Sequence, residues 1–328
     1  MTDGMKHVFV IAASVLLSAQ AEAAQSRAAD VRFPLRPVRM IVANGPGSAP
    51  DVVARLLGAK LAEVWGQSVV IDNRTGATGL IAVETLVNSP PDGHTMFLST
   101  MTQLISTLMY QRLQLATETE PVALVGTTPF VIVVNTALPV KNMAEWIAYA
   151  KARQGQLLYG SGGQWGSSHL CIESLNSMTG LRMTHVPYKS TATTLADLIA
   201  GQIHVYCPAA PSLPAFIASG RVRALGVTYK QPTKLVPGVP PVSDTVPGFE
   251  LLGWYGMNLP LRTPKEIVSR VNAGITTALR DSDLQEKLFA VGAEASPTTP
   301  GEFGAFLQRQ TQHWHKLLKE TGAIAPKG

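Results

Sequence analysis

The chain has 328 residues, of which 46% are hydrophobic and 15% are charged, and its formal net charge is +5. This composition excludes a disordered chain, and the length allows two domains of ordinary size. We expect no nucleic-acid partner, because the sequence has no run of Lys and Arg and no basic stripe with interleaved aromatic residues.

The N-terminus has the pattern of a secretory signal peptide. Met5-Lys6-His7 precedes an apolar run from Val8 to Leu17, and Ala21-Glu22-Ala23 places small residues two apart. The run is about ten residues long, which is too short to span a bilayer. We therefore expect residues 1–24 to be removed by cleavage near residue 23. Loss of one lysine and two acidic residues then changes the formal charge from +5 to +6, on a soluble periplasmic protein.

The predicted elements alternate between strand and helix, beginning with an apolar strand at residues 38–44. Pro50 suits the first position of the following helix, in which apolar residues recur at spacings of three and four. Further strands are expected at residues 69–72, 95–98, 122–125 and 130–134, and further helices at residues 80–87 and 142–152. Alternation at this spacing is typical of parallel βαβ units.

The same alternation continues through the second half of the chain. Strands are expected at residues 157–159, 183–186, 203–206 and 223–227, and helices from residue 167 and at residues 193–200 and 213–219. Residues 230–250 are rich in Pro and Gly and form a long connection, after which residues 251–257 return the chain to the first domain. In the tail, Thr263-Pro264-Lys265-Glu266 and Thr299-Pro300-Gly301-Glu302 each predict a helix with Thr as N-cap and Pro at the first position.

Two turns lead from a strand through glycines into a helix, and this arrangement is typical of an anion-binding site. The first turn is residues 44–51, and the second contains Gly160, Gly162, Gly163 and Gly166 before a helix that starts at Ser167. Glycines at such a turn expose backbone N–H groups at the positive end of the helix dipole, and serine hydroxyls add donors without charge. The second turn is therefore expected to receive a small anion.

Enzyme interpretations fit the residues less well. Gly160, Gly162 and Gly166 resemble a dinucleotide fingerprint, but the next strand ends at Tyr188-Lys189 without the acidic residue that would bind a ribose. A hydrolase lacks support because the sequence has no G-x-S-x-G or HExxH motif. We expect no enzyme activity, no cofactor and no metal.

The sequence has two cysteines, Cys171 and Cys207, whose spacing fits no metal site. An oxidising compartment would allow them to pair. We nevertheless favour two unpaired cysteines over a disulfide.

Several motifs resemble the Bug/TctC family, the extracytoplasmic solute receptors of tripartite tricarboxylate transporters. The similarity runs from about Pro34 to the C-terminus. The motifs that carry it are Gly79-Leu80, Pro90-Pro91-Asp92-Gly93, residues 160–170, His185-Val186-Pro187-Tyr188-Lys189, Asp197-Leu198 and Gly201-Gln202.

The resemblance implies an α/β fold of the Venus-flytrap type, with two domains that are each a mostly parallel sheet flanked by helices. We expect domain 1 to comprise residues 25–126 and 254–328, and domain 2 to comprise residues 127–253. The ligand would be closed into the cleft between the domains by a hinge near residues 126–129 and 251–256.

The resemblance also implies a site in which each domain supplies one loop to the ligand's carboxylate, residues 44–51 from domain 1 and residues 161–169 from domain 2. Tyr188 is expected to face the cleft, and Trp165 either covers the ligand or packs against its own loop. The candidate ligand-binding residues are Asn44, Gly45, Gly47, Ser48, Ala49, Ser161, Gly162, Gly163, Trp165, Ser167, Ser168 and Tyr188.

Other residues near these loops are interpreted as structural. Asp51 lies at a helix start and would act as a partner of the helix dipole, because a carboxylate would repel an anionic ligand. His169 is expected to pack or cap, and Trp254 and Tyr255 to pack in the core. None of these four residues is a candidate ligand-binding residue.

The predicted function is capture of a small carboxylate and its delivery to two membrane transporter subunits by a monomeric receptor. A ligand-sensing receptor that acts through a membrane sensor would use the same binding chemistry and stays an alternative. Many family members carry an acidic residue where this chain has Cys207-Pro208. We therefore expect simple carboxylates to bind better than amino acids.

Overall fold

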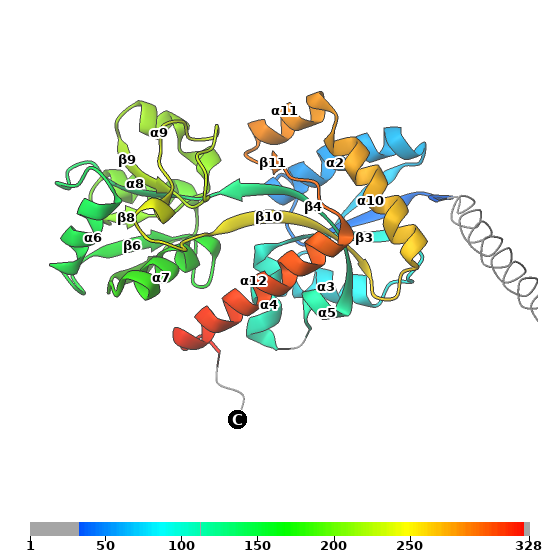
Figure 1. The fold of residues 1–328 in the computed structure, drawn as a ribbon, viewed down its shortest axis with the longest axis horizontal. Coiled ribbons are helices and arrows are strands. Elements are labelled where there is room, and N and C mark those ends of the chain that lie inside the picture. Colours follow the sequence, from blue (N-terminus) through cyan, green and yellow to red (C-terminus); the bar gives the residue numbers. More distant parts are fainter. Residues whose placement is uncertain (1–32, 112, 325–328) are drawn as a thin grey trace, which may run out of the picture.

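The computed structural model describes residues 33–111 and 113–324, and these residues form two lobes that lie side by side (Figure 1). The first lobe is built on a six-stranded sheet of order β11-β4-β10-β3-β1-β2, and the second lobe on a five-stranded sheet of order β7-β6-β8-β5-β9. Helices cover both sheets. The predicted signal peptide, residues 1–24, lies outside the described residues.

The first lobe takes its elements from both ends of the chain. Its strands are β1 (Val38–Val42), β2 (Val69–Asn73), β3 (Thr95–Thr100), β4 (Thr119–Pro129), β10 (Leu252–Pro260) and β11 (Glu294–Ala295). Its helices are α2 (Ala49–Trp65), α3 (Leu80–Val87), α4 (Met101–Tyr110), α5 (Leu115–Glu118), α10 (Lys265–Leu279), α11 (Ser282–Ala290) and α12 (Pro300–Glu320), with a 3-10 turn at Ala77–Gly79.

The second lobe is formed by one continuous part of the chain. Its strands are β5 (Val131–Asn135), β6 (Leu158–Ser161), β7 (Thr184–Pro187), β8 (Val205–Tyr206) and β9 (Val222–Val227). Its helices are α6 (Met143–Lys151), α7 (Ser167–Thr179), α8 (Thr191–Ile199) and α9 (Pro214–Ala218), and short 3-10 turns lie at Ala210–Ser212 and Val242–Asp244.

Both sheets are mixed, with parallel pairs on one side and antiparallel pairs on the other. Strand β1 pairs in parallel with β2 and β3, whereas β10 pairs antiparallel with β3 and β4. In the second lobe β6 is parallel to β7 and β8, and β5 is antiparallel to β8 and β9. The βα alternation predicts the parallel pairs. The antiparallel pairs of β10 and β5 form where the chain changes lobes, with no crossover helix before either strand, and β11 adds a further antiparallel pair with β4.

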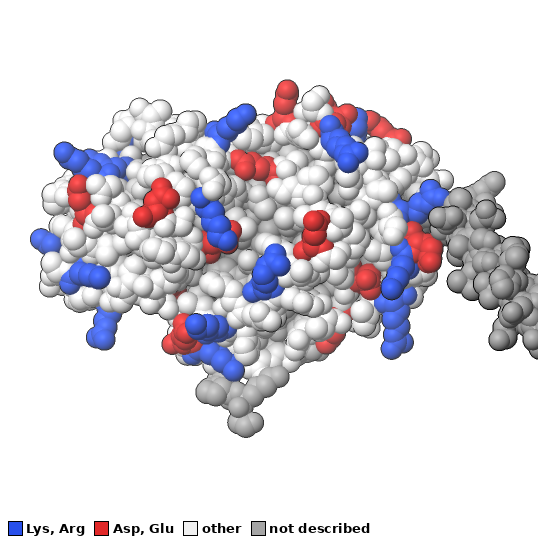
Figure 2. Space-filling view, in the orientation of Figure 1, with Lys and Arg blue, Asp and Glu red and all other residues white. Residues whose placement is uncertain are grey.

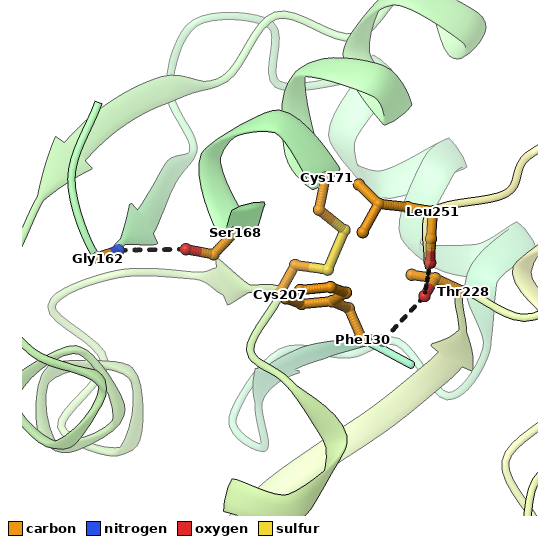
Figure 3. The surroundings of a disulfide bond; sticks show 7 residues. All are labelled: Phe130, Gly162, Ser168, Cys171, Cys207, Thr228 and Leu251. Atoms are coloured by element: carbon orange, nitrogen blue, oxygen red, sulfur yellow. Dashed lines mark hydrogen bonds between the residues drawn. A yellow bond between two sulfur atoms is a disulfide. The ribbon is translucent and has the colours of Figure 1, made fainter. Parts of the chain in front are cut away.

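The two crossing segments are joined by one threonine. The chain enters the second lobe at Phe130, between β4 and β5, and returns at Leu251, just before β10. The Thr228 hydroxyl accepts a hydrogen bond from the Phe130 N–H at 2.9 Å and donates to the Leu251 carbonyl at 2.7 Å (Figure 3). Thr228 is fully buried. The two predicted hinge segments are thus tied to each other in the interior.

One apolar core continues from one lobe into the other. It contains Ile41 and Phe97 of the first-lobe sheet, Ile132 and Trp146 of the second lobe, and Trp314 of α12. Helix α12 runs diagonally from the first lobe toward the second (Figure 1). The lobes therefore share buried apolar surface in addition to their two covalent connections.

One of the two predicted threonine N-caps is confirmed. Asn142 caps α6 and Thr299 caps α12, where Glu302 completes a capping box. The expectation that Thr263 caps a helix is wrong: α10 has Pro264 as N-cap, and the Thr263 hydroxyl donates to the Pro260 carbonyl at 2.7 Å. That bond closes the turn before the helix, so Thr263 lies one residue before the N-cap. Within residues 33–111 and 113–324, no helix is both long and apolar enough to span a membrane.

Candidate functional site

A cavity of about 170 Å³ lies between the lobes. The first lobe lines it at the ends of β1 and β3, the second lobe at the start of α7 and after β8, and the crossing segments form the rest. The lining residues are Asn44, Pro50, Thr100, Met101, Thr102, Thr128, Phe130, Ser167, Ala209, Gly253, Trp254 and Tyr255. Pockets for drug-sized ligands span roughly 300–1,000 Å³, so this interlobe cavity suits a small molecule.

The first loop, residues 44–51, brings the start of α2 to the cavity. Ser48 is the N-cap of α2 but makes no capping hydrogen bond with its side chain; its hydroxyl donates to the Gly45 carbonyl at 2.7 Å. Asn44 lines the cavity, and within the described chain its side-chain amide has no hydrogen-bond partner. The start of α2 therefore offers an uncapped helix N-terminus, and Asn44 offers a free amide, to a ligand.

The buried carboxylate of Asp51 holds the first loop in place through hydrogen bonds. Its carboxylate is 1% exposed and accepts hydrogen bonds from the Gly47 N–H at 2.9 Å, Asn73 Nδ2 at 2.9 Å and Arg55 Nε at 2.9 Å. Burial alone would raise the pKa of Asp51, but the bonds from Arg55, Asn73 and Gly47 outweigh it and lower the pKa to about 2. Asp51 is thus a structural partner of the first turn, in line with its interpretation from the sequence.

The second loop, residues 161–169, connects β6 to α7. The N-cap of α7 is Gly166, which has no side chain to cap the helix. Ser167 is the first residue of α7 and lines the cavity, and its hydroxyl has no hydrogen-bond partner among the described residues. Within the loop, the Gly162 N–H donates to Ser168 Oγ at 3.2 Å (Figure 3) and the Gly163 N–H donates to Ser161 Oγ at 3.1 Å. Several glycine N–H groups therefore hold the loop itself in shape.

A buried aromatic cluster lies beneath the second loop. Ser161 Oγ is 2.6 Å from His185 Nε2, and the His185 ring stacks on Tyr159 at 5.0 Å between ring centres. The rings of His169 and His185 are 4.2 Å apart, centre to centre. Burial, and then the neighbouring His185, lower the pKa of His169 to about 4; burial also lowers the pKa of His185. Both rings are therefore neutral at pH 7.

Ten of the twelve candidate residues do not line the cavity. Trp165 packs edge-on against His169, with ring centres 5.0 Å apart, and so packs against its own loop. The Tyr188 hydroxyl donates to Asp197 Oδ2 at 2.7 Å, and burial together with this bond raises the pKa of Tyr188 to about 12. Asn44 and Ser167 line the cavity; the others form or flank the two loops: Gly45, Gly47, Ser48, Ala49, Ser161, Gly162, Gly163, Trp165, Ser168 and Tyr188.

A third strand-to-helix turn, not predicted from the sequence, lies at the cavity. Strand β3 ends at Thr100, which caps α4 in a capping box with Gln103, and Met101 and Thr102 of this helix line the cavity. The T-x-x-Q spacing of Thr100 and Gln103 is a signal that could have identified this helix start. The lining residues of the crossing segments carry no such local signal.

Cys171 of α7 and Cys207, just after β8, form a disulfide with a Cα–Cα distance of 6.3 Å (Figure 3). The expectation of unpaired cysteines is therefore wrong. Strands β6 and β8 are neighbours in the sheet although they are distant in sequence, so the helix that follows β6 lies over the end of β8. The disulfide fixes the start of α7, with Ser167, relative to Ala209 on the other side of the cavity.

The lining residues of the cavity include no Asp, Glu, Lys, Arg or His. An anion would therefore be held by neutral donors and by helix termini, and no carboxylate on the wall would pair with an ammonium group. In the described part of the chain, no group of three or more His, Cys, Asp or Glu side chains could hold a metal ion.

A larger groove of about 740 Å³ lies elsewhere between the lobes and is lined by residues 232–234, α11 and β11. We call it the outer groove. Its walls carry charges of both signs, among them Lys234 and Glu286. Acidic and basic side chains are also interspersed over the face shown in Figure 2. We assign the ligand site to the smaller cavity, because helix N-termini and strand ends of both lobes meet there.

Two lobes on separate sheets, two crossing segments and a small cavity between the lobes define the class of periplasmic binding proteins. MatC of Rhodopseudomonas palustris, solved with bound malate, has this fold: the TM-score is 0.71 at 27% identity, over 88% of this chain and all of that one (100%). An R. palustris protein solved with adipate aligns with a TM-score of 0.72 at 32% identity, over 90% of this chain and 100% of that one.

The chain belongs to the tripartite tricarboxylate transporter receptor family, whose sequence model matches residues 53–323. It is 31% identical to the protein BugT of Bordetella pertussis over 299 residues, which cover 89% of this chain and 91% of BugT. The resemblance found in the motifs is thus confirmed. The family and the fold are those of substrate-binding proteins rather than enzymes.

Proposed function

We propose that this protein is a periplasmic receptor that captures a small carboxylate between its lobes and delivers it to a tripartite tricarboxylate-type membrane transporter. Its signal peptide would be removed near residue 23. The domain limits proposed from the sequence, residues 25–126 with 254–328 and residues 127–253, would be the two bodies that close on the ligand. The delivery step would involve two membrane subunits, as in other receptors of this family.

The observation that carries the proposal is the cavity between two uncapped helix termini, those of α2 and α7. Asn44 supplies a free amide from one lobe and Ser167 a free hydroxyl from the other. A carboxylate bound by both would stabilise the arrangement in which the lobes approach each other, in proportion to its preference for that arrangement. Structures of similar proteins with malate and adipate support this ligand class.

The absence of charge in the lining predicts a choice between acids and amino acids. Malate and aspartate differ in a hydroxyl against an ammonium group, and the cavity wall has no carboxylate to pair with the latter. We expect malate to bind more tightly than aspartate, because a desolvated ammonium without a partner is unfavourable. Isothermal titration of both ligands checks this. Tighter binding of aspartate would contradict the proposed wall chemistry.

The proposed function is tested by a thermal-shift screen of the mature protein against mono-, di-, tri-, aromatic and amino-carboxylates. A ligand at about 100 times its dissociation constant adds roughly 2.7 kcal/mol to the free energy of unfolding, which raises the melting temperature by several degrees. A shift confined to one class of carboxylate identifies the substrate type. If no carboxylate shifts the melting temperature, the proposal fails.

Ser167→Ala tests whether the start of α7 binds the ligand. Loss of a hydrogen bond to a charged group costs about 1.5–3 kcal/mol, so we expect affinity for the best ligand to fall by roughly ten-fold or more. Ser219→Ala is the control, because Ser219 is an exposed serine of the second lobe whose hydroxyl bonds within its own turn, to the Phe216 carbonyl. Equal affinities of the two variants would place the site elsewhere.

A further inference from the structure

The outer groove contains a second set of contacts between the lobes. The Thr233 hydroxyl, from the long connection of the second lobe, donates to the Glu294 carboxylate of β11 in the first lobe. Thr233 is 8% exposed, so this bond lies largely out of water. Glu294 and Thr233 both line the groove.

A close backbone contact lies next to this bond. Gly292, between α11 and β11, approaches Pro211 of the second lobe so closely that a Cβ atom on Gly292 would lie 1.7 Å from Pro211 Cγ. The Gly292 carbonyl also accepts a hydrogen bond from the Thr128 hydroxyl at 2.8 Å. Only a residue without a side chain can occupy this position. The backbone at Gly292 of the first lobe is therefore packed directly against Pro211 of the second lobe, beside the outer groove.

The sheet order places these contacts and the ligand cavity on opposite sides of the crossing strands. In the first-lobe sheet, β11 lies on one side of β4 and β10, and β3 and β1 lie on the other. The contacts involve β11, whereas the cavity is lined by residues at the ends of β3 and β1. A rotation about the crossing segments that narrows the cavity therefore widens the outer groove.

We propose that the contact of Thr233 and Pro211 with Glu294 and Gly292 opposes ligand closure, and so sets the affinity of the cavity for its ligand. The contact is made in the arrangement described here and is lost when the cavity closes. Its free energy favours the open arrangement, and the apparent affinity falls with the fraction of closed molecules. This inference rests on the proposed function, because it assumes a ligand that closes the cavity.

The test is Glu294→Ala, with Glu286→Ala as the matched control. Both variants remove one carboxylate from the outer groove, but only Glu294 is bonded across the lobes to Thr233. We expect Glu294→Ala to bind malate roughly three- to ten-fold more tightly than the native protein, because one interlobe hydrogen bond to a charged group is lost from the open form. The control should bind malate as the native protein does.

A second readout needs no ligand. Spin labels at Lys234→Cys and Ser282→Cys, which lie on opposite walls of the outer groove, report its width by pulsed dipolar spectroscopy. We expect Glu294→Ala without ligand to show a larger population of long distances than the native protein. Malate added to the native protein should shift the distribution in the same direction.

The outcomes separate the inference from the proposed function. If the native protein binds malate and Glu294→Ala changes neither affinity nor width, the inference is overturned and the function stands. If no carboxylate binds but Glu294→Ala widens the groove, the contact holds the lobes as inferred and the ligand class is wrong. If neither effect is seen, both fail. Circular dichroism confirms that each variant is folded before it is compared.

Discussion

At the scale of single residues, His169 and His185 are the titratable pair closest to the second loop. His169 is 5% exposed, and its ring faces both His185 and the indole of Trp165. Burial lowers the pKa of His185 overall, because it outweighs the charge of Glu173, which alone would raise that pKa. The shape of the loop thus depends on two neutral rings in a small space.

The lowered pKa of His169 predicts a loss of stability in mild acid. The unfolded chain takes up a proton near pH 6.5, whereas the folded chain resists it until about pH 4. The contribution of neutral His169 to the free energy of unfolding is therefore fully present above pH 6.5. It is lost as the pH falls toward 4, by about 3 kcal/mol in total. Urea unfolding at pH 7, 5.5 and 4 measures this loss.

His169→Phe keeps a ring in the cluster and removes the titration, so the fall in stability between pH 7 and pH 4 should become smaller. The variant also loses His169 Nδ1, which accepts a hydrogen bond from the backbone N–H of Trp165 at 3.4 Å. Its stability at pH 7 is therefore compared with its own values at lower pH. An unchanged pH dependence would assign the acid sensitivity to other groups.

At the scale of elements, Thr228 holds the two crossing segments together. We expect Thr228→Val to lower the free energy of unfolding by about 1–3 kcal/mol for each of the two backbone groups left unpaired, the Phe130 N–H and the Leu251 carbonyl. Valine has nearly the same shape, so packing is kept and the loss reports the hydroxyl. Urea denaturation measures it.

Thr127→Val serves as the comparison for this variant. Thr127 also lies in a crossing segment, and its hydroxyl bonds to Tyr229 rather than to two backbone groups of different segments. Thr127→Val should lower the free energy of unfolding by less than Thr228→Val does. Equal costs would mean that Thr228 has no special part in joining the segments.

The disulfide ties α7 to the end of β8 and should contribute strongly to stability. Cys171 and Cys207 are 36 residues apart, and closing a loop of this length in the unfolded chain is worth about 4 kcal/mol in the chain-entropy account. We expect the double variant Cys171→Ala and Cys207→Ala to lose up to that amount. The same loss should follow when the native protein is reduced, and urea unfolding with and without reductant measures both. Identical curves would contradict the prediction.

The sequence predicted the elements that local signals define. The glycines and serines after β6 and the proline at the start of α2 identified the two loops, and each loop contributes one of its predicted residues, Ser167 and Asn44, to the cavity wall. These signals are local because a turn and a helix start depend on a few neighbouring residues.

Features that depend on the order of strands could not be predicted in this way. The pairing of Cys171 with Cys207 follows from β6 and β8 being neighbours, and the place of Trp254 at the cavity follows from the insertion of β10 beside β3. The pairing of β6 with β8 and that of β10 with β3 cannot be inferred from the spacing of residues within either strand. Thr263 failed for a different reason: the helix begins one residue later, with Pro264 as its N-cap, and Thr263 lies in the preceding turn, where its hydroxyl donates to the Pro260 carbonyl.

At the scale of the whole molecule, the shared core predicts that the lobes unfold together. One apolar cluster contains Phe97 of the first lobe, Trp146 of the second and Trp314 of α12. Melting either lobe alone would expose part of this cluster to water, which is unfavourable. We therefore expect one calorimetric transition, with equal calorimetric and van't Hoff enthalpies. Two resolved transitions would show that the lobes are independent.

The position of β10 in the first-lobe sheet restricts the order in which that sheet can form. Strand β10 lies between β3 and β4, yet it consists of residues 252–260, which are synthesised long after both of its neighbours. Until it arrives, β1, β2 and β3 are separated from β4 by an empty place in the sheet. The five strands of the second lobe lie in residues 131–227 and so precede β10 in the chain. The first lobe contains the N-terminal strands, yet its sheet can be completed only with a strand that follows all five strands of the second lobe in the chain.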